Sequence, residues 1–271
     1  MIVDPHTHVW INDPGFPWPA ENSDPPEEDC TAEMLLREMA AHGVDRTVLV
    51  QVIHYRWDNR YVADAVRRYP AKFMAVGRID PEDPASPDHL SMWTEEHGLH
   101  GVWLSPSVDA AGDWFGGPLM PPVFARAEAL GVPLLLLTRP PRLRDLIPLL
   151  EAHGDLDVVI DHMADVAPGD AEGRRILMDL ARFPRVYVKI SHTWSISGET
   201  YPWADTHGLV EEVYQSFGPR RIMWGTDWPV SLGKAEYGQT LSVVRDGMKF
   251  FAPGDLEWVL GKTALRLWSF S

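Results

Sequence analysis

Eight short aliphatic and β-branched runs recur along the chain, and this recurrence constrains the fold more than any other feature of the sequence. The runs are Ile2–His6, Arg46–Val52, Phe73–Ile79, Gly101–Leu104, Val132–Leu137, Asp157–Ile160, Val186–Ile190 and Arg221–Trp224. Each run has few polar residues, which is typical of parallel strands that are covered on both faces. Amphipathic stretches separate the runs, at Thr31–His42, Tyr61–Tyr69, Met120–Leu130, Arg142–His153, Gly173–Arg182 and Thr206–Phe217. This alternation predicts a parallel α/β fold.

Two parallel α/β architectures fit the alternation, a closed barrel and a doubly wound open sheet. The chain has 271 residues, close to the length of about 250 that is typical of one barrel. The first predicted strand is followed by no glycine-rich phosphate loop, and polar residues follow several different strands. We therefore expect a single-domain (β/α)₈ TIM barrel that spans residues 1–271.

Charge and composition limit the kinds of partner that this chain can bind. The net charge is −15, from 39 acidic and 24 basic residues, which disfavours binding to nucleic acid or to an acidic membrane surface. No apolar run approaches the ~20 residues of a membrane span, and the N-terminus does not resemble a signal peptide. Cys30 is the only cysteine, which fits a reducing compartment. We expect a cytoplasmic protein with a small-molecule substrate, and the sequence leaves homo-oligomer formation open.

Two histidines, separated by one residue, lie in the segment Asp4-Pro5-His6-Thr7-His8 at the end of the first predicted strand. The side-chain period of two places His6 and His8 on one face of that strand. In a barrel this face is the interior at the carboxyl end, where paired imidazoles suit a divalent metal or a proton relay. The alternative is a pair of surface histidines after a short strand.

The sixth and eighth predicted strands also end in polar residues. Asp227 follows the eighth strand in Trp224-Gly225-Thr226-Asp227-Trp228-Pro229, where a carboxylate can ligate a metal or accept a proton from water. Its alternative role is a helix N-cap. After the sixth strand, Asp161 and His162 are adjacent, so strand alternation allows only one of them to face inward. We assign His162 to the site and Asp161 to hydrogen bonds that support the site residues or the loop, and the reverse stays open.

Three basic residues are candidates for substrate binding. Lys189 shares a face of the seventh predicted strand with Ser191, and a buried lysine requires a carboxylate partner unless it snorkels to the strand end. Arg139 follows the fifth strand, where a guanidinium can hold a substrate carboxylate through a bidentate pair. Arg78, on the third strand, is a weaker candidate for the same contact. Either arginine can instead be a structural salt-bridge partner.

Two irregular segments are expected at the barrel mouth. Residues Asn12–Asp29 are rich in proline and acidic side chains, and we expect an ordered loop over the mouth, with a disordered insertion as the alternative. Residues His192–Asp205 follow the seventh strand and are expected to line the same mouth. Tryptophans can wall a pocket there or serve in packing, namely Trp10, Trp57, Trp103, Trp194 and Trp228.

Four segments in this order, VDPHTHVW, VIDHM, MWGTDWP and GKTALRLW, resemble the amidohydrolase-related family that includes sugar lactonases and 2-pyrone-4,6-dicarboxylate lactonase. The similarity runs nearly from end to end. It implies a distorted (β/α)₈ barrel in which the family's histidine pair, strand-six histidine and strand-eight aspartate correspond to His6 and His8, His162, and Asp227. In metal-dependent members such residues hold a divalent ion, often zinc, that activates water. In some lactonases of the group the metal is dispensable.

The sequence departs from the fuller metal-binding pattern of the family at two strands. The fifth strand ends Leu136-Leu137-Thr138-Arg139, where many members have a histidine. The fourth ends at Ser105, without the lysine or glutamate that bridges two metals elsewhere. We therefore expect at most one divalent ion, zinc or manganese, on His6, His8, His162 and Asp227, or a site that works without metal.

These features together predict a hydrolase that adds water to a small lactone or related cyclic ester. Asp227 would act as the general base, while His6, His8 and His162, or a metal that they hold, would polarise the carbonyl. The resemblance leaves a second class open, a metal-dependent nonoxidative decarboxylase of an aromatic or unsaturated acid. A barrel that binds a ligand without catalysis is the third alternative.

Overall fold

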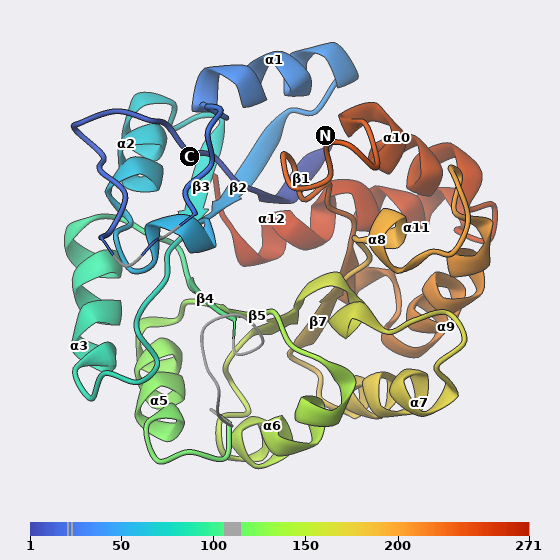
Figure 1. Ribbon diagram of the computed structural model, residues 1–271. Coiled ribbons are helices and arrows are strands. Elements are labelled where there is room, and N and C mark those ends of the chain that lie inside the picture. Colours follow the sequence, from blue (N-terminus) through green and yellow to red (C-terminus); the bar gives the residue numbers. More distant parts are fainter. Residues whose placement is uncertain (21, 23, 106–114, 271) are drawn as a thin grey trace.

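The computed structural model describes residues 1–20, 22, 24–105 and 115–270, and in them eight parallel strands form a barrel surrounded by helices (Figure 1). The strands are β1 Val3–Thr7, β2 Arg46–Val50, β3 Phe73–Val76, β4 Val102–Leu104, β5 Leu134–Leu136, β6 Val158–Ile160, β7 Val186–Lys189 and β8 Ile222–Met223. They pair in chain order as two sheets, β1 to β3 and β4 to β8. Bridges from Gly77 to Val102 and from Thr7 to Trp228 join the two sheets. The predicted barrel is confirmed.

All eight predicted strands are present, and most are shorter than predicted. The second run was expected to reach Val52, but strand β2 ends at Val50 and a 3₁₀ turn begins at Ile53. Five strands, β2, β3, β5, β7 and β8, end before the predicted residue, where the chain turns into the loops of the mouth. The direction of the side chains just after these strand ends is therefore set by the conformation of the loops and not by the pleat of the sheet.

The six predicted helices are all present and form most of the outer ring. The helices are α1 Ala32–His42, α2 Arg60–Arg68, α3 Ser86–Ser91, α5 Met120–Leu130, α6 Pro140–Ala152, α7 Ala171–Asp179, α8 Thr193–Ile196, α9 His207–Phe217, α10 Tyr237–Ser242, α11 Pro253–Glu257 and α12 Thr263–Leu267. Helix α1 shows why the helices could be predicted from the sequence: residues that cap both of its ends are present. The Thr31 side chain accepts a hydrogen bond from the Met34 amide at its start, and Gly43 ends it in a left-handed conformation.

The barrel interior has its own hydrophobic core, separate from the larger core between strands and helices. Alternate residues of the strands fill it, among them Val3, Val48, Trp103 and Tyr187. Helix α12 lies across the barrel in Figure 1 and is followed by the buried Trp268, which belongs to this inner core. Because the interior is packed solid, chemistry is confined to the carboxyl end of the strands.

The long segment between β1 and α1 is ordered over its described residues, as expected. The backbones of Trp10 and Cys30 exchange two hydrogen bonds of 2.8 and 3.1 Å, which ties the two ends of the loop together. Trp18 stacks on Tyr55 with 4.2 Å between ring centroids. Glu21 and Ser23 lie outside the described residues. Within the part of the chain that the structure describes, no helix has both the length and the apolar character needed to cross a membrane.

Candidate functional site

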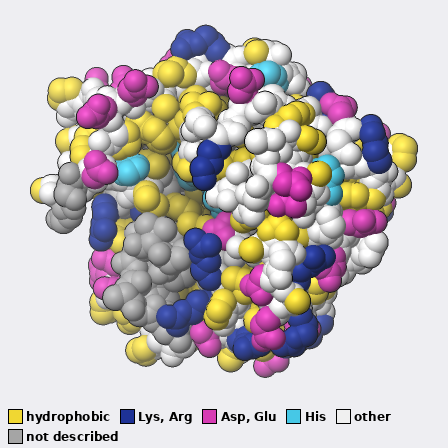
Figure 2. Space-filling model, turned by 45° about the vertical axis from the view of Figure 1, so that its right-hand side comes forward, with side chains coloured by type: hydrophobic (Ala, Val, Ile, Leu, Met, Phe, Trp, Pro, Cys, Tyr) yellow, Lys and Arg dark blue, Asp and Glu magenta, His cyan; other side chains and the backbone are white. Residues whose placement is uncertain are grey.

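A chamber of about 210 Å³ opens at the carboxyl end of the strands, and the predicted site residues lie at its inner end. Its lining residues come from β4 and from the loops that follow most of the other strands: His8, Trp10, Val52, Ile53, His54, Trp103, Leu137, His162, His192, Asp227 and Val230. Figure 2 shows a hollow on one face of the molecule with many hydrophobic side chains around it. The chamber is therefore mainly apolar, with polar groups gathered around Asp227.

The junction of β1 and β8 sets His6, His8 and Asp227 side by side. The Asp227 amide donates to the His6 carbonyl at 2.9 Å, and the His8 amide donates to the Trp228 carbonyl at 2.7 Å. Asp227 itself has a left-handed backbone, with φ of 59°. These main-chain bonds join residues more than two hundred positions apart, so the two most distinctive motifs of the sequence form one structural unit.

A buried carboxylate beneath the site holds this junction together. Asp4 accepts a 2.6 Å hydrogen bond from the Thr226 hydroxyl and a 3.1 Å bond from the Tyr237 hydroxyl. Burial raises the pKa of Asp4 to about 6 although these hydrogen bonds oppose the rise. Asp4, two residues before His6, therefore fixes Thr226, the residue that precedes Asp227.

The structure brings together the four residues that the sequence nominated. His8 Nε2 lies 2.9 Å and His6 Nε2 3.5 Å from Asp227 Oδ1. The rings of His6 and His162 are 4.6 Å apart between centroids. One ligand atom each from His6, His162 and Asp227 lie within 4.8 Å of one another, and all three residues are buried. His8 adjoins this cluster through its contact with Asp227.

Sequence reasoning missed His192, which is central to the site. Its Nε2 lies 2.6 Å from Asp227 Oδ2, and its Nδ1 lies 2.9 Å from Asp165 Oδ1. The ring also stacks on that of His162, with centroids 3.5 Å apart and planes 3° from parallel. The segment that begins at His192 was expected to line the mouth, but this side chain was not singled out. Its position just after β7 was the available signal, because the other site residues also follow strand ends.

Asp161 has the hydrogen-bonding role that the sequence predicted for it, since it lies beneath His6 and does not line the chamber. The expectation that only one of Asp161 and His162 can face inward is wrong, because both side chains contact His6. Strand β6 ends at Ile160, and the residues that follow form a 3₁₀ turn with φ of 53° at His162. The period-two rule applies only within a strand, so it did not apply here. Asp161 Oδ1 lies 3.5 Å from His6 Nδ1, and His162 Nδ1 bonds to the Ser191 hydroxyl at 2.7 Å.

Lys189 is fully buried and has the carboxylate partner that its burial required. Its ammonium lies 2.9 Å from Asp161 Oδ1 and 2.8 Å from His6 Nδ1. Lys189 does not line the chamber, because its side chain is engaged beneath the histidines. The structure therefore corrects its predicted role as a substrate contact: it positions His6 and Asp161.

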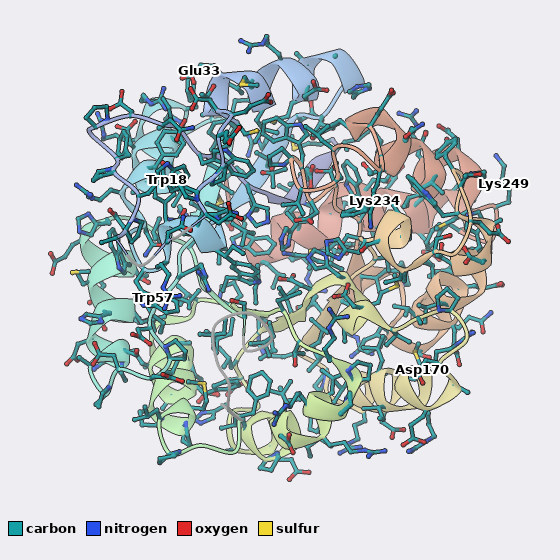
Figure 3. All side chains as sticks on the ribbon, viewed as in Figure 1. Trp18, Glu33, Trp57, Asp170, Lys234 and Lys249 are labelled. Carbon is teal, nitrogen blue, oxygen red and sulfur yellow. The ribbon has the colours of Figure 1, made fainter. Side chains whose placement is uncertain are left out.

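Arg78 is also corrected, from a substrate contact to a buried structural residue. Its guanidinium donates to the Ser105 hydroxyl at 2.7 Å and lies over the rings of Trp57 and Trp103, 4.8 and 5.1 Å from their centroids. Trp57 is labelled in Figure 3. Arg78 is fully buried and does not line the chamber. Its guanidinium instead packs behind Trp103, which does line it.

Arg139 lies beside the chamber, in a second hollow of about 460 Å³ that shares Leu137 and His192 with the chamber lining. Its side chain is 60% exposed, and its Nη1 lies 3.3 Å from Asp165 Oδ2. A substrate group that reaches Arg139 must therefore extend out of the chamber. The structure thus places this residue near the site but not within it.

The surroundings set the charge of each site residue. Burial raises the pKa of Asp227, but His192 and His8 outweigh it and hold that pKa well below the usual value. Burial lowers the pKa of His192, yet Asp227 and Asp165 raise it overall to about 9. Burial and the Lys189 charge lower the pKa of His6 to about 4. At neutral pH the site therefore contains an ionised Asp227, a protonated His192 and a neutral His6.

The donor set fits a single divalent cation. His6 Nε2 is buried without a hydrogen-bond partner and faces Asp227 Oδ1, which is the arrangement that a shared ion would satisfy. Burial and the charge of His192 hold the pKa of His162 well below its usual value, so this imidazole is also neutral. Two neutral imidazoles and one carboxylate suit zinc or manganese.

This chain is similar to known proteins over most of its length. The amidohydrolase family model matches residues 3–270. The L-fucono-1,5-lactonase of Burkholderia ambifaria is 29% identical over 241 residues, which cover 87% of this chain and 83% of the relative. The 4-sulfomuconolactone hydrolase of Hydrogenophaga intermedia is 27% identical over 231 residues, or 84% of this chain and 74% of the relative.

The fold is shared with solved structures. A crystal structure of an amidohydrolase from Burkholderia multivorans with bound zinc superimposes with a TM-score of 0.82 and covers 100% of both chains, at 22% sequence identity. At this identity the match supports the barrel.

Proposed function

This chain belongs to the amidohydrolase family, and we propose that it hydrolyses a small lactone or related cyclic ester. One observation carries the proposal: a buried, ionised Asp227 is held between His8 and His192 at the inner end of a chamber. A carboxylate in this state can accept a proton at neutral pH. The relatives described above act on lactones by their names, which supports this choice of substrate class.

Asp227 acts as the general base. The contacts of Oδ1 with His8 Nε2 and of Oδ2 with His192 Nε2 fix the carboxylate plane, so that it does not have to reorient during the reaction. Asp227 takes a proton from the attacking water while the water oxygen bonds to the lactone carbonyl carbon. A positioned base of this kind contributes ~10²–10⁴-fold to the rate.

His192 completes the proton transfer. Its Nε2–H lies next to Asp227 Oδ2 at 2.6 Å, and its ring lines the chamber. When the ring C–O bond of the lactone breaks, the leaving alkoxide needs the proton that Asp227 has taken from water. We assign its delivery to the Asp227–His192 pair, and the product is the open hydroxy acid.

The neutral histidines provide the electrophilic side of the site. His6, His162 and Asp227, with His8 beside them, would hold one zinc or manganese ion. Such an ion, when bound, polarises a carbonyl and lowers the pKa of water. In its absence the buried Nε2–H of His6 is available as a hydrogen-bond donor, because Lys189 donates to His6 Nδ1 at 2.8 Å.

Arg139 is our candidate for binding a substrate group outside the chamber. Its exposure and its place in the neighbouring hollow suit a carboxylate on an extended substituent. A decarboxylase remains the alternative function for the same barrel. It is less well supported, because the similar relatives named above are hydrolases and because no histidine follows strand β5.

The Asp227→Asn variant tests the proposal. The amide keeps the size of the side chain but cannot accept the proton, so kcat on a lactone should fall ~10²–10⁴-fold while the fold and KM change little. Asp155→Asn is a matched control, because this carboxylate is 93% exposed and remote from the chamber lining. Near-normal kcat in Asp227→Asn would refute the assigned base and make His162 the leading candidate.

A further inference from the structure

The chamber that leads to Asp227 is lined mainly by apolar side chains and histidines, although the relatives of this chain include a hydrolase of a sulfonated lactone. Apart from four histidines and Asp227, its lining consists of Trp10, Val52, Ile53, Trp103, Leu137 and Val230. No Lys or Arg of the described residues lines it. Residues 21, 23, 106–114 and 271, outside the description, carry no Lys or Arg in the sequence.

The nearest buried cations are committed elsewhere. Lys189 is paired with Asp161 beneath His6. Arg78 donates to the Ser105 hydroxyl and lies over the ring of Trp103, so it contacts a chamber wall from outside the lining. Neither side chain can turn into the chamber without leaving another buried group unpaired.

The exposed cations of this region also lie outside the chamber. Lys234, labelled in Figure 3, has its ammonium 5.7 Å from the centroid of the Trp194 ring. Arg139 lies in the neighbouring hollow beside Asp165. An acidic group attached directly to the ring of a substrate would therefore enter an apolar chamber in which the one charged imidazole, His192, already lies between the carboxylates of Asp227 and Asp165.

Several hydrogen-bonding groups of the described chamber lining are already engaged and cannot receive sugar hydroxyls, although the Trp103 indole N–H is buried without a partner. Both ring nitrogens of His8 are engaged, by the Val50 carbonyl at 2.7 Å and by Asp227 at 2.9 Å. Both nitrogens of His192 face carboxylates, and the Trp10 indole N–H donates to the Glu28 carbonyl. Hydroxyl groups would lose water there and gain few partners in return.

Resting on the lactone hydrolysis proposed above, we propose that the ring admitted to this chamber is an uncharged lactone with an apolar substituent. A cavity of about 150 Å³ lined by apolar side chains accommodates benzene, so 210 Å³ suits one ring with a short substituent. An acidic group is accepted only on a chain long enough to leave the chamber and reach Arg139. The relatives' anionic and polyhydroxylated lactones are thus poor substrates here.

Three γ-lactones that differ in one substituent test this inference. They are γ-valerolactone, its analogue with a carboxylate in place of the methyl group, and its analogue with a hydroxymethyl group there. We expect kcat/KM to be at least about 100-fold higher for γ-valerolactone than for the carboxylate, with the hydroxymethyl compound between them. Equal or faster hydrolysis of the carboxylate would overturn the inference while lactone hydrolysis itself stood.

A variant that adds the missing cation provides an independent test. Val230 lines the chamber and is 50% exposed, so Val230→Arg can place a guanidinium at the rim without disturbing the core. Val230→Gln is the matched uncharged control. The ratio of kcat/KM for the carboxylate to that for γ-valerolactone should be at least about tenfold higher in the arginine variant than in the glutamine variant. An unchanged ratio would show that charge does not limit entry.

A binding measurement separates failure of this inference from failure of the proposed function. Trp10 and Trp103 line the chamber, so their fluorescence should respond to 3-methylcyclopentanone but not to 3-oxocyclopentane-1-carboxylate at the same concentration. If no lactone were hydrolysed but this preference held, the proposed reaction would be wrong and the chamber assignment would stand. Equal binding of the two ketones, or binding of neither, would overturn the chamber assignment.

Discussion

Replacing Lys189 with methionine should destabilise the protein far more than an ordinary lysine substitution. The Lys189 and Asp161 side chains are both 0% exposed and are 2.9 Å apart. Removal of the ammonium leaves Asp161 buried without its charge partner and His6 Nδ1 without its donor. Breaking a buried pair by removing one partner costs about 3–5 kcal/mol. For a chain of this size the loss corresponds to a fall in Tm of about 6–10 °C.

Urea and thermal unfolding, followed by circular dichroism, measure this effect. Lys262→Met is the matched control, because Lys262 pairs with Glu257 on the surface at 50% exposure and should cost at most about 1 kcal/mol. The double variant Lys189→Met/Asp161→Leu removes both charges and should recover most of the lost stability. If Lys189→Met unfolded at the same urea concentration as Lys262→Met, the buried pair would not hold the site together.

Three further predictions concern substrate contact, metal and pH. Arg139→Ala should raise KM more than it lowers kcat for a lactone whose acidic substituent extends from the chamber, and steady-state kinetics with equal effects on both would contradict a binding role. Elemental analysis should find at most one zinc or manganese per chain, and two equivalents would refute a single site. His192 has a folded-state pKa of about 9, above its unfolded value near 6.5, so its stabilising contribution is complete below pH 6.5 and is lost as the pH rises to 9. Metal-free protein should thus lose about 3 kcal/mol across this window, a loss absent from His192→Asn in urea titrations at several pH values.

The strands and most helices could be predicted from the sequence because their signals are local. Apolar runs of strand length and amphipathic stretches with caps, such as Thr31 and Gly43 around α1, depend on neighbouring residues alone. The convergence of His6, His8 and Asp227 was predictable for a related reason. Parallel strands of a barrel end at the same face, so residues that follow strand ends must meet there.

The orientation of side chains beyond the strand ends was not predictable in this way. Asp161 and His162 face the same interior because His162 and the residues after it adopt a left-handed turn, which the alternation rule does not cover. His192 likewise follows β7 with φ of 62°. Positive φ in residues other than glycine is uncommon and is imposed by the packing of the whole loop. A local sequence pattern therefore does not predict it.

The partners of the buried charges were also decided by the tertiary structure alone. The sequence required Lys189 to have a carboxylate if it was buried, but Asp161 became that partner only because β6 and β7 are neighbours in the barrel. The sequence offered Arg139 and, as the weaker candidate, Arg78 for a substrate contact. Arg78 lies buried between tryptophan rings, whereas Arg139 is 60% exposed in a second hollow. Burial and charge pairing depend on contacts between residues far apart in the chain, so they are fixed only when the barrel closes.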